Sequence, residues 1–516
     1  AVVGNDYRER YGPFLGMSER FLSGYLEASE AVAGRYISGL DLAALCPGAS
    51  SPPPPPADEC NTTAECRAQH GSRATDCVNS QSDQSYCACG GERCVPPSTP
   101  SPGGVDETLA CAERVLRPVI EQLLRRPVSD AALSRYTRFV ETARGLDLSF
   151  VDGLTAGLSA VFMSPDFLIV GSDSESAPGP QVLDGYARAE RLALALWDSV
   201  PDAELREAAR SGALDTDAGL EAQVRRMLED PEKGGRLLDG FIASHFDLPS
   251  ETAVPLGLEA LGARGTQLAA DMRQEAVLLI EALFERNLSV DRLVEGRTAF
   301  LNQRLAEHYG IAGVSGEAFE EVSTEGTPRV GGLLTSGAVL AQEGDLIHRG
   351  VNVLQSFLCQ DFAAPDPALV EAALARLPDN ASDREQVEFR KDSGCAGCHM
   401  FIDPLGAAFE GFDGAGQPRE RYENGDSVLY ESDYQGRKIL GPEDVSRVVL
   451  ESQMRRCIAS KVLGWVSFRR LLTIDRPDRC AADALLDQVS SEAGVRDLFI
   501  QSFSTPTFQS RVVGQP

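Results

Sequence analysis

The chain has 516 residues, 43% hydrophobic and 24% charged, a composition typical of globular rather than disordered proteins. Its 48 Lys and Arg against 77 Asp and Glu give a formal net charge of −29, which argues strongly against a nucleic-acid partner because phosphates would be repelled. No window approaches about 18 consecutive apolar residues, so we expect no transmembrane helix, and any export signal must lie upstream of residue 1.

Apolar side chains recur at helical spacing along much of the chain, which predicts long helices. The predicted helices span residues 21–36, 111–123, 187–197, 272–284 and 445–468, with a further helix beginning at Pro201-Asp202. Alternating strand patterns are scarce outside residues 428–440 and the cysteine-rich region. We therefore expect a mainly α protein with a multi-helical body and a small disulfide-rich β insertion.

Eight of the 13 cysteines lie between Cys46 and Cys111, a density typical of disulfide-stabilised modules. Zinc ligands usually come in C-x2-C to C-x4-C pairs, and short spacings are few here, so disulfides are favoured over a metal. Proline-rich runs at 52–56 and 96–100 are stiff spacers, which makes residues 47–105 an insertion on stalks. A Cys46–Cys111 disulfide would close its base, and such bonds indicate an oxidising compartment: periplasm, cell surface or exterior.

The six central cysteines of this insertion resemble an EGF-like module, whose signature is a C-x-C between its fourth and fifth cysteines. The resemblance implies the disulfides Cys60–Cys77, Cys66–Cys87 and Cys89–Cys94. Six cysteines allow 15 pairings, so the sequence alone leaves other connectivities open. We expect a small accessory domain, with surface assembly through this insertion as the alternative.

The segment Cys395-Ala-Gly-Cys398-His399 is a C-x-x-C-H motif, the attachment signature of c-type haem. Two thiols one helical turn apart can add to the two haem vinyl groups, and the adjacent imidazole can bind the iron. A thioredoxin-like pair would need a βαβ setting and a zinc site would need further nearby ligands, and the sequence predicts neither. The motif therefore predicts one covalent haem c, with His399 as its proximal ligand.

Residues Cys395 to Arg419 resemble the C-x-x-C-H-x-x-I-D-P-x-G-x-x-x-E-x-F-D-x-x-G-x-x-R signature of planctomycete-type cytochrome c-like secreted proteins, which are assembled from consecutive domains of unknown function. Similar segments occur at 125–130, 157–168, 196–202, 301–311, 332–335 and 349–350. The resemblance implies a secreted protein with a large helical body and a cytochrome c-like haem domain, but it implies no substrate. Many relatives carry a His at the position of Phe389. If that His binds iron in the relatives, Phe389 cannot do so in this chain.

Further cofactor contacts can be proposed from residue chemistry. The second ring nitrogen of His399 needs an acceptor, and the turn at 402–405, with Pro404, can supply a backbone carbonyl. Arg349 and Arg419 are candidates to neutralise haem propionates, because a guanidinium fork suits carboxylates. Ordinary structural ion pairs are an equally good interpretation of both arginines.

The sixth iron ligand is the open question of this site. Met454 follows His399 by 55 positions, a separation compatible with His/Met ligation, but its apparent helix also suits a packing role. His348 is a second candidate. His308 is better explained as holding a helix end, and Met400 should point away from the distal face.

Two cysteines near the C-terminus, Cys457 and Cys480, are expected to form a disulfide, which leaves Cys359 buried and unpaired. The expected divisions are an N-terminal helical segment (1–46), the insertion (47–105), a helical segment packing with the first (106–150), a helical body (151–345), a haem domain (346–440) and a C-terminal helical domain (441–516).

The leading functional hypothesis is an exported mono-haem cytochrome that transfers electrons to or from a partner protein with a basic docking surface. A peroxidase-like or oxidase haem enzyme with an open distal site is the first alternative. A structural or adhesive surface component with an auxiliary haem is the second. The sequence leaves open whether the protein is an enzyme.

Overall fold

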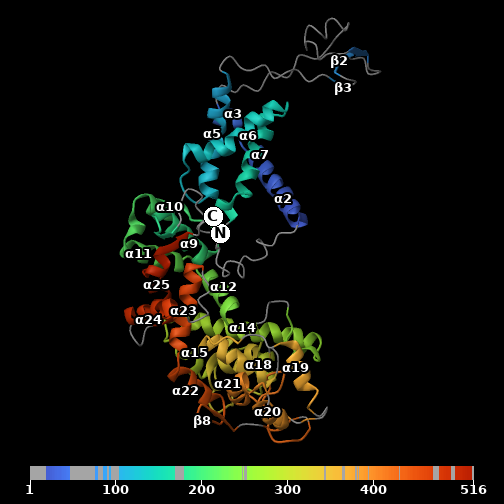
Figure 1. Cartoon of the computed structure of the whole chain (residues 1–516), viewed down its shortest axis with the longest axis vertical. Coiled ribbons are helices and arrows are strands. Elements are labelled where there is room, and N and C mark those ends of the chain that lie inside the picture. The colour runs from blue at the N-terminus through green and yellow to red at the C-terminus, as the bar shows by residue number, and fades with distance from the viewer. Residues whose placement is uncertain are drawn as a thin grey trace. The chain divides into compact units, whose positions relative to one another are not determined.

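The computed structural model describes most of the chain outside the N-terminus and the insertion (Figure 1). The described residues are 19–46, 76–79, 85–89, 92–93, 104–168, 179–246, 248, 253–341, 345–362, 366–377, 381, 383–392, 394–422, 424–428, 431–468, 476–489 and 494–513. The chain divides into two compact units, residues 13–176 and residues 177–516 grouped with 1–12.

Helices dominate the first unit. They are α2 (Glu19–Ser38), α3 (Leu42–Leu45), α5 (Gly104–Leu123), α6 (Asp130–Gly145), α7 (Phe150–Phe162) and α8 (Pro165–Leu168). Ser149 begins α7 with a capping box in which its hydroxyl and the Asp152 carboxylate satisfy each other's backbone amides. Helix α7 packs on both α2 and α6, so the expected boundary at residue 150 falls inside this unit rather than between units.

A disulfide joins Cys46, at the end of α3, to Cys111 in α5, with a Cα–Cα distance of 5.6 Å. This is the pair that the sequence predicted at the base of the insertion. Within the insertion the structure describes an antiparallel sheet of β1 (Asp76–Asn79), β2 (Ser85–Cys89) and β3 (Glu92–Arg93). The three disulfides implied by the EGF-like resemblance lie outside the residues whose side chains are described.

The second unit is also mainly helical, as predicted. Its helices are α9 (Gly185–Trp197), α10 (Ala203–Arg210), η3 (Ala213–Asp215), α11 (Asp217–Leu228), α12 (Arg236–His245), α13 (Leu256–Glu259), α14 (Ala263–Glu285), α15 (Arg292–Glu295), α16 (Gln303–Tyr309), η4 (Gly332–Thr335), α17 (Gly337–Ala341), α18 (Leu346–Asn352), η5 (Val353–Phe357), α19 (Pro367–Leu374), α20 (Asp383–Asp392), α21 (Ala396–Ala407), α22 (Pro442–Glu451), α23 (Met454–Ser467), α24 (Arg476–Gln488), α25 (Val495–Ser502) and α26 (Pro506–Gln509). Three antiparallel two-stranded ribbons complete it: β4 (Gly179–Val182) with β9 (Ser510–Val513), β5 (Thr298–Leu301) with β6 (Glu320–Ser323), and β7 (Ser432–Tyr434) with β8 (Arg437–Ile439).

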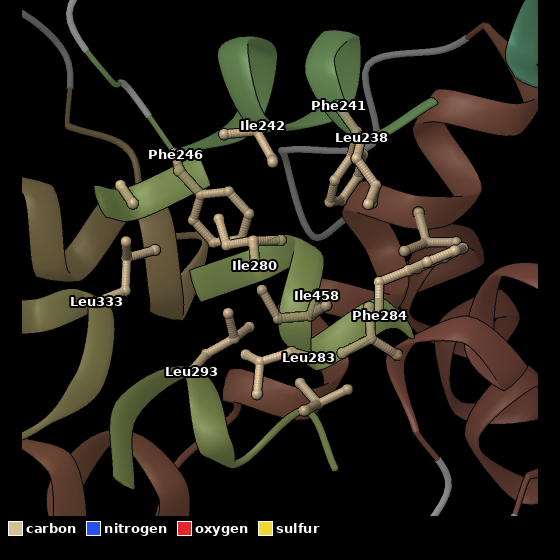
Figure 2. Packing of buried hydrophobic residues seen from close by; sticks show 14 of the residues in the cluster. Leu238, Phe241, Ile242, Phe246, Ile280, Leu283, Phe284, Leu293, Leu333 and Ile458 are labelled. Carbon is tan, nitrogen blue, oxygen red and sulfur yellow. The ribbon is translucent and has the colours of Figure 1, made fainter. Parts of the chain in front are cut away.

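A continuous hydrophobic core runs through the second unit. Figure 2 shows part of it, where Phe241 of α12 and Phe246, the residue that follows α12, face Ile280 and Phe284 of α14, with Ile458 of α23 nearby. The same cluster includes buried residues of α21, so the helix of the C-x-x-C-H motif and the C-terminal helices share one core. The expected boundaries at 345 and 440 therefore do not separate independent cores.

The predicted helix at 445–468 is two helices, because α22 ends and α23 begins around Ser452 and Gln453. Ser452 leaves helical geometry with ψ of −118°, and its hydroxyl donates to the carbonyl of Val448. The Gln453 side chain donates to the carbonyl of Leu358 at 2.7 Å. This tertiary hydrogen bond fixes the break, and the prediction of one continuous helix was wrong.

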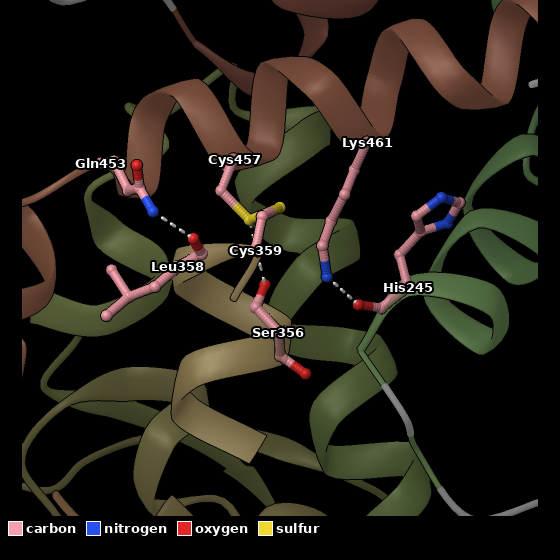
Figure 3. Close-up of a disulfide and its surroundings, with 7 residues drawn as sticks. All are labelled: His245, Ser356, Leu358, Cys359, Gln453, Cys457 and Lys461. Carbon is pink, nitrogen blue, oxygen red and sulfur yellow. Dashed lines mark hydrogen bonds between the residues drawn. A yellow bond between two sulfur atoms is a disulfide. The ribbon is translucent and has the colours of Figure 1, made fainter. Parts of the chain in front are cut away.

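The predicted Cys457–Cys480 disulfide is also wrong, because Cys457 bonds to Cys359 with a Cα–Cα distance of 5.4 Å (Figure 3). Cys480 is an exposed thiol on α24. The reason is helical phase: Arg456 is the residue of α23 that pairs with α24, through Asp483. Cys457 is rotated about 100° from Arg456 and faces η5 instead.

Among the described residues, no helix is both long and apolar enough to cross a membrane.

Candidate functional site

The C-x-x-C-H motif occupies the first turn of α21, where Cys395 is the N-cap residue. The amides of Cys398 and His399 both donate to the Cys395 carbonyl, at 3.3 and 3.1 Å, which places the two thiols one helical turn apart. Cys395 is partly exposed, Cys398 is exposed, and neither forms a disulfide. The motif is therefore accessible from the surface.

The imidazole of His399 is held by a carboxylate from its own helix. Nδ1 of His399 donates to Oδ1 of Asp403 at 2.8 Å, and Nε of Arg390 on α20 donates to Oδ2 of the same carboxylate at 2.7 Å. Asp403 is buried, and the side chains of Arg390 and His399 are 12% and 18% exposed. Because Nδ1 is engaged, Nε2 is the ring nitrogen available to a metal.

The predicted backbone acceptor for His399 is replaced by this carboxylate. The carbonyl of Pro404 instead accepts a hydrogen bond from the Ser432 hydroxyl at 2.8 Å, at the start of β7. Pro404 lies inside α21 and is buried. Its proposed role at the cofactor stays a prediction.

Two glycines let α21 pack closely against α18. A Cβ at Gly350 would lie 2.2 Å from the carbonyl oxygen of Ile402, and a Cβ at Gly406 would lie 1.9 Å from that of Leu346. Any side chain at either position would therefore push the two helices apart. This contact fixes the buried half of α21 and leaves its first turn, with the motif, facing outward.

The two arginines considered for haem propionates both bind Glu410. Arg349 is 3% exposed and gives its N–H groups to the carbonyls of Leu340, Phe409, Phe412 and Asp413. It also lies 3.5 Å from the Glu410 carboxylate, and burial lowers its pKa to about 10. Arg349 is thus an internal clamp whose N–H groups are all engaged, which favours the structural interpretation of this residue over a propionate contact.

Arg419 donates through Nε to the Glu410 carbonyl at 2.8 Å and through a terminal nitrogen to the Glu410 carboxylate at 2.9 Å. Its guanidinium also lies over the ring of Tyr422. These contacts support the structural interpretation that the sequence left open, rather than a propionate partner.

The candidates for the sixth ligand occupy different environments. Met454 is fully buried in the hydrophobic core, which agrees with the packing role. His308 is buried, and its Nε2 bonds to the carbonyl of Ala415 at 2.8 Å, where burial lowers its pKa. His348 is half-exposed, and its Nδ1 bonds to Asp345 at 2.7 Å.

Of these candidates only His348 presents a partly exposed ring on α18, the helix that packs against α21. Met400 is 57% exposed and directly follows His399.

The donor set of the motif fits haem c better than a bare metal ion. Within the described ranges, no three His, Cys, Asp or Glu side chains converge as a protein-only metal site requires. Haem c needs a different arrangement, with two thiols for the edge of the ring and one imidazole nitrogen for its centre. Cys395, Cys398 and Nε2 of His399 supply those groups.

Asp403 and Arg390 are the site residues that the sequence analysis missed. A signal for Asp403 was present, because it follows His399 by four residues and therefore lies on the same helical face. No comparable signal identified Arg390, which comes from the separate helix α20.

A cavity of about 640 Å³ lies near the other end of α21, where Ala408, Phe412 and Leu440 contribute to its lining and Arg447 to its polar part. Ala408 is nine residues after His399, roughly 13 Å along the helix axis. The cavity therefore does not adjoin the C-x-x-C-H motif.

Three family models match the chain in succession. They are PSD5, protein of unknown function (DUF1595), at residues 111–170, PSD4, protein of unknown function (DUF1592), at 183–311, and PSCyt3, protein of unknown function (DUF1588), at 330–422. The third match contains the whole C-x-x-C-H motif and its supporting residues. Searches of curated proteins and of solved structures found no match. The chain thus carries three consecutive domains of unknown function that fit the planctomycete-type cytochrome c-like multidomain family.

Proposed function

We propose that this protein is an exported mono-haem c-type cytochrome that transfers electrons. The observation that carries the proposal is the arrangement of the motif: two accessible cysteines on one turn of α21, followed by a histidine whose Nδ1 is already engaged. Cys395 and Cys398 would form the thioethers, and Nε2 of His399 would bind the iron. When bound, haem c supplies a reversible one-electron Fe(III)/Fe(II) couple.

The protein's own contribution is to hold this group at the surface of a rigid body. The close packing of α18 on α21, fixed by Gly350 and Gly406, sets the position of the motif, and the exposure of Cys398 places it within reach of a partner. The net charge of −29 would steer a partner with a basic docking surface.

Export is part of the same proposal. Thioether attachment of haem c and the disulfides Cys46–Cys111 and Cys359–Cys457 all suit an oxidising compartment. The periplasm, the outer surface and the exterior satisfy this requirement equally.

A haem enzyme of the peroxidase or oxidase type is the second candidate. The observation that favours it is the carboxylate behind His399, because an anionic acceptor makes an imidazole ligand more strongly donating and favours oxidised iron. Its distal position would be open to peroxide or oxygen.

The visible spectrum of the reduced, purified protein separates the two candidates. Electron transfer predicts a low-spin ferrous spectrum with split visible bands that carbon monoxide does not change. A high-spin spectrum that shifts on addition of carbon monoxide would favour the enzyme. A His348→Ala variant that converts the first spectrum into the second would identify His348 as the sixth ligand.

A further inference from the structure

We propose that Asp403 is a positioning residue that acts through His399 to lower the midpoint potential of the iron, and that Arg390 limits this effect. The inference rests on the proposed function and names residues that the motif itself does not include. It starts from the hydrogen-bonded series of Arg390, Asp403 and His399, which joins α20 to the first turn of α21.

The carboxylate of Asp403 is fixed at both oxygens. Oδ1 accepts from Nδ1 of His399 at 2.8 Å, and Oδ2 accepts from Nε of Arg390 at 2.7 Å. The side chain is 5% exposed, so water does not compete for these bonds. The imidazole therefore has one orientation and one tautomer, with its proton on Nδ1 and its lone pair on Nε2.

The charge of the acceptor has an electronic consequence. A carboxylate draws the Nδ1 proton more strongly than a neutral carbonyl does, which leaves more electron density on Nε2. A more basic ligand, with a negative charge buried behind it, stabilises ferric over ferrous iron. The Pro404 carbonyl, in the turn expected to supply a backbone acceptor, is bonded to Ser432, and the acceptor that His399 finds is the Asp403 carboxylate.

Arg390 opposes this effect. Its guanidinium compensates the buried negative charge and draws electron density from Oδ2, the oxygen that does not face the histidine. Removing the charge of Asp403 and removing that of Arg390 should therefore shift the potential in opposite directions. A purely structural role for the three residues predicts no such opposition.

The test compares four full-length proteins by redox titration: wild type, Asp403→Asn, Arg390→Gln and Lys391→Gln. Asn keeps an oxygen that can accept from Nδ1, and Gln keeps a donor near Oδ2, so each variant removes charge with little change of shape. Lys391 is the matched control, because it is adjacent to Arg390 on α20 but is 61% exposed and pairs with the exposed Glu388.

We expect Asp403→Asn to raise the midpoint potential, Arg390→Gln to lower it, and Lys391→Gln to leave it at the wild-type value. A tenfold change in the relative stability of ferric and ferrous iron, the scale typical of outer ligand partners, corresponds to about 59 mV. Equal potentials in all four haem-loaded proteins, or shifts of the first two in the same direction, would overturn the inference. If Asp403→Asn does not fold, the Arg390→Gln variant tests the inference alone: a lowered midpoint potential supports it, and an unchanged or raised potential overturns it.

Covalent haem is measured by mass spectrometry on every sample. A wild-type protein without haem would contradict the proposed function, whereas haem-loaded proteins with unchanged potentials would contradict only the role of Asp403.

Discussion

Cys359 and Cys457 form a buried disulfide that ties the end of η5 to α23 across 98 residues of sequence. Gln453, Cys457 and Lys461 repeat every four residues along α23, and Figure 3 shows all three directed at partners from earlier in the chain. The C-terminal helices are thereby fastened to the part of the unit that also contains the haem motif.

Loss of this disulfide should destabilise the second unit substantially. Cys359→Ala with Cys457→Ala should lower the free energy of unfolding by about 2–5 kcal/mol, since the bond closes a long loop. Chemical denaturation under non-reducing conditions measures the effect. The control is Cys480→Ala, an exposed thiol that should change stability by less than about 0.5 kcal/mol. Equal effects of the two changes would show that the pairing is wrong.

Gly406→Ala should destabilise the helix that carries the haem motif. A Cβ there would lie 1.9 Å from the Leu346 carbonyl oxygen, so α18 and α21 must separate, at a cost of about 1–3 kcal/mol. Gly397→Ala, in the same helix, meets nothing within 4 Å and should be neutral or stabilising by up to about 1 kcal/mol. Thermal unfolding of both variants tests the contact, and a neutral Gly406→Ala would argue against it.

Arg349→Met should unfold the second unit more readily and should not act mainly on the cofactor. The change takes one of two arginine partners from the buried carboxylate of Glu410 and leaves several buried carbonyls without their donor, a loss of about 3–5 kcal/mol. Arg437→Met removes an arginine from an exposed pair with Glu451 and should cost less than about 1 kcal/mol. Denaturant titration gives both values. A stable Arg349→Met protein with an altered haem potential would instead restore the propionate assignment.

The buried Glu275 should make stability depend on pH above its ordinary pKa of 4.5, because burial raises the pKa of this carboxyl. Its Oε2 accepts from the Tyr309 hydroxyl at 2.6 Å and from the Gly337 amide at 3.1 Å. The folded protein keeps a proton that the unfolded chain loses, so this contribution is complete below pH 4.5 and is lost as the pH rises toward the folded pKa.

Glu275→Gln should remove that dependence, so the stability of the variant relative to wild type should increase as the pH rises above 4.5. Glu321→Gln is the control, because the pKa of Glu321 is shifted in the opposite direction: a hydrogen bond from Arg286 lowers it. Its effect should therefore appear as the pH falls below 4.5. Melting temperatures measured across this range test both, and parallel curves for wild type and Glu275→Gln would refute the burial argument.

Local patterns predicted the mainly α class and several of its helices, among them α2, α5, α9 and α14. The apolar repeats at 21–36, 187–197 and 272–284 fall within α2, α9 and α14. Helix α14 buries one face and α9 is buried on nearly all sides, whereas α2 buries Ala33 and Ile37 and leaves Val32 and Tyr36 of its apolar repeat exposed. The break between α22 and α23 could not be found in this way. It depends on the hydrogen bond from Gln453 to Leu358, which only the folded chain brings together.

At the site, the sequence supplied residue types but not their partners. Cys457 follows Arg456 directly, and which of them faces α24 depends on the phase of α23 against its neighbours. A guanidinium such as that of Arg349 can bind a propionate or backbone carbonyls equally well. In the folded protein Arg349 is buried and binds carbonyls. The four-residue spacing of Asp403 from His399 places both side chains on one helical face, but spacing alone does not decide between its carboxylate and a backbone acceptor.

We expect Cys395 and Cys398 to carry a covalent haem, which peptide mass spectrometry of the exported protein would detect. The peptide containing both cysteines should gain the mass of one haem and resist alkylation, and a Cys395→Ala, Cys398→Ala double variant should lose the haem while remaining folded. An unmodified wild-type peptide, with both thiols alkylated after expression alongside a haem c attachment system, would contradict this expectation.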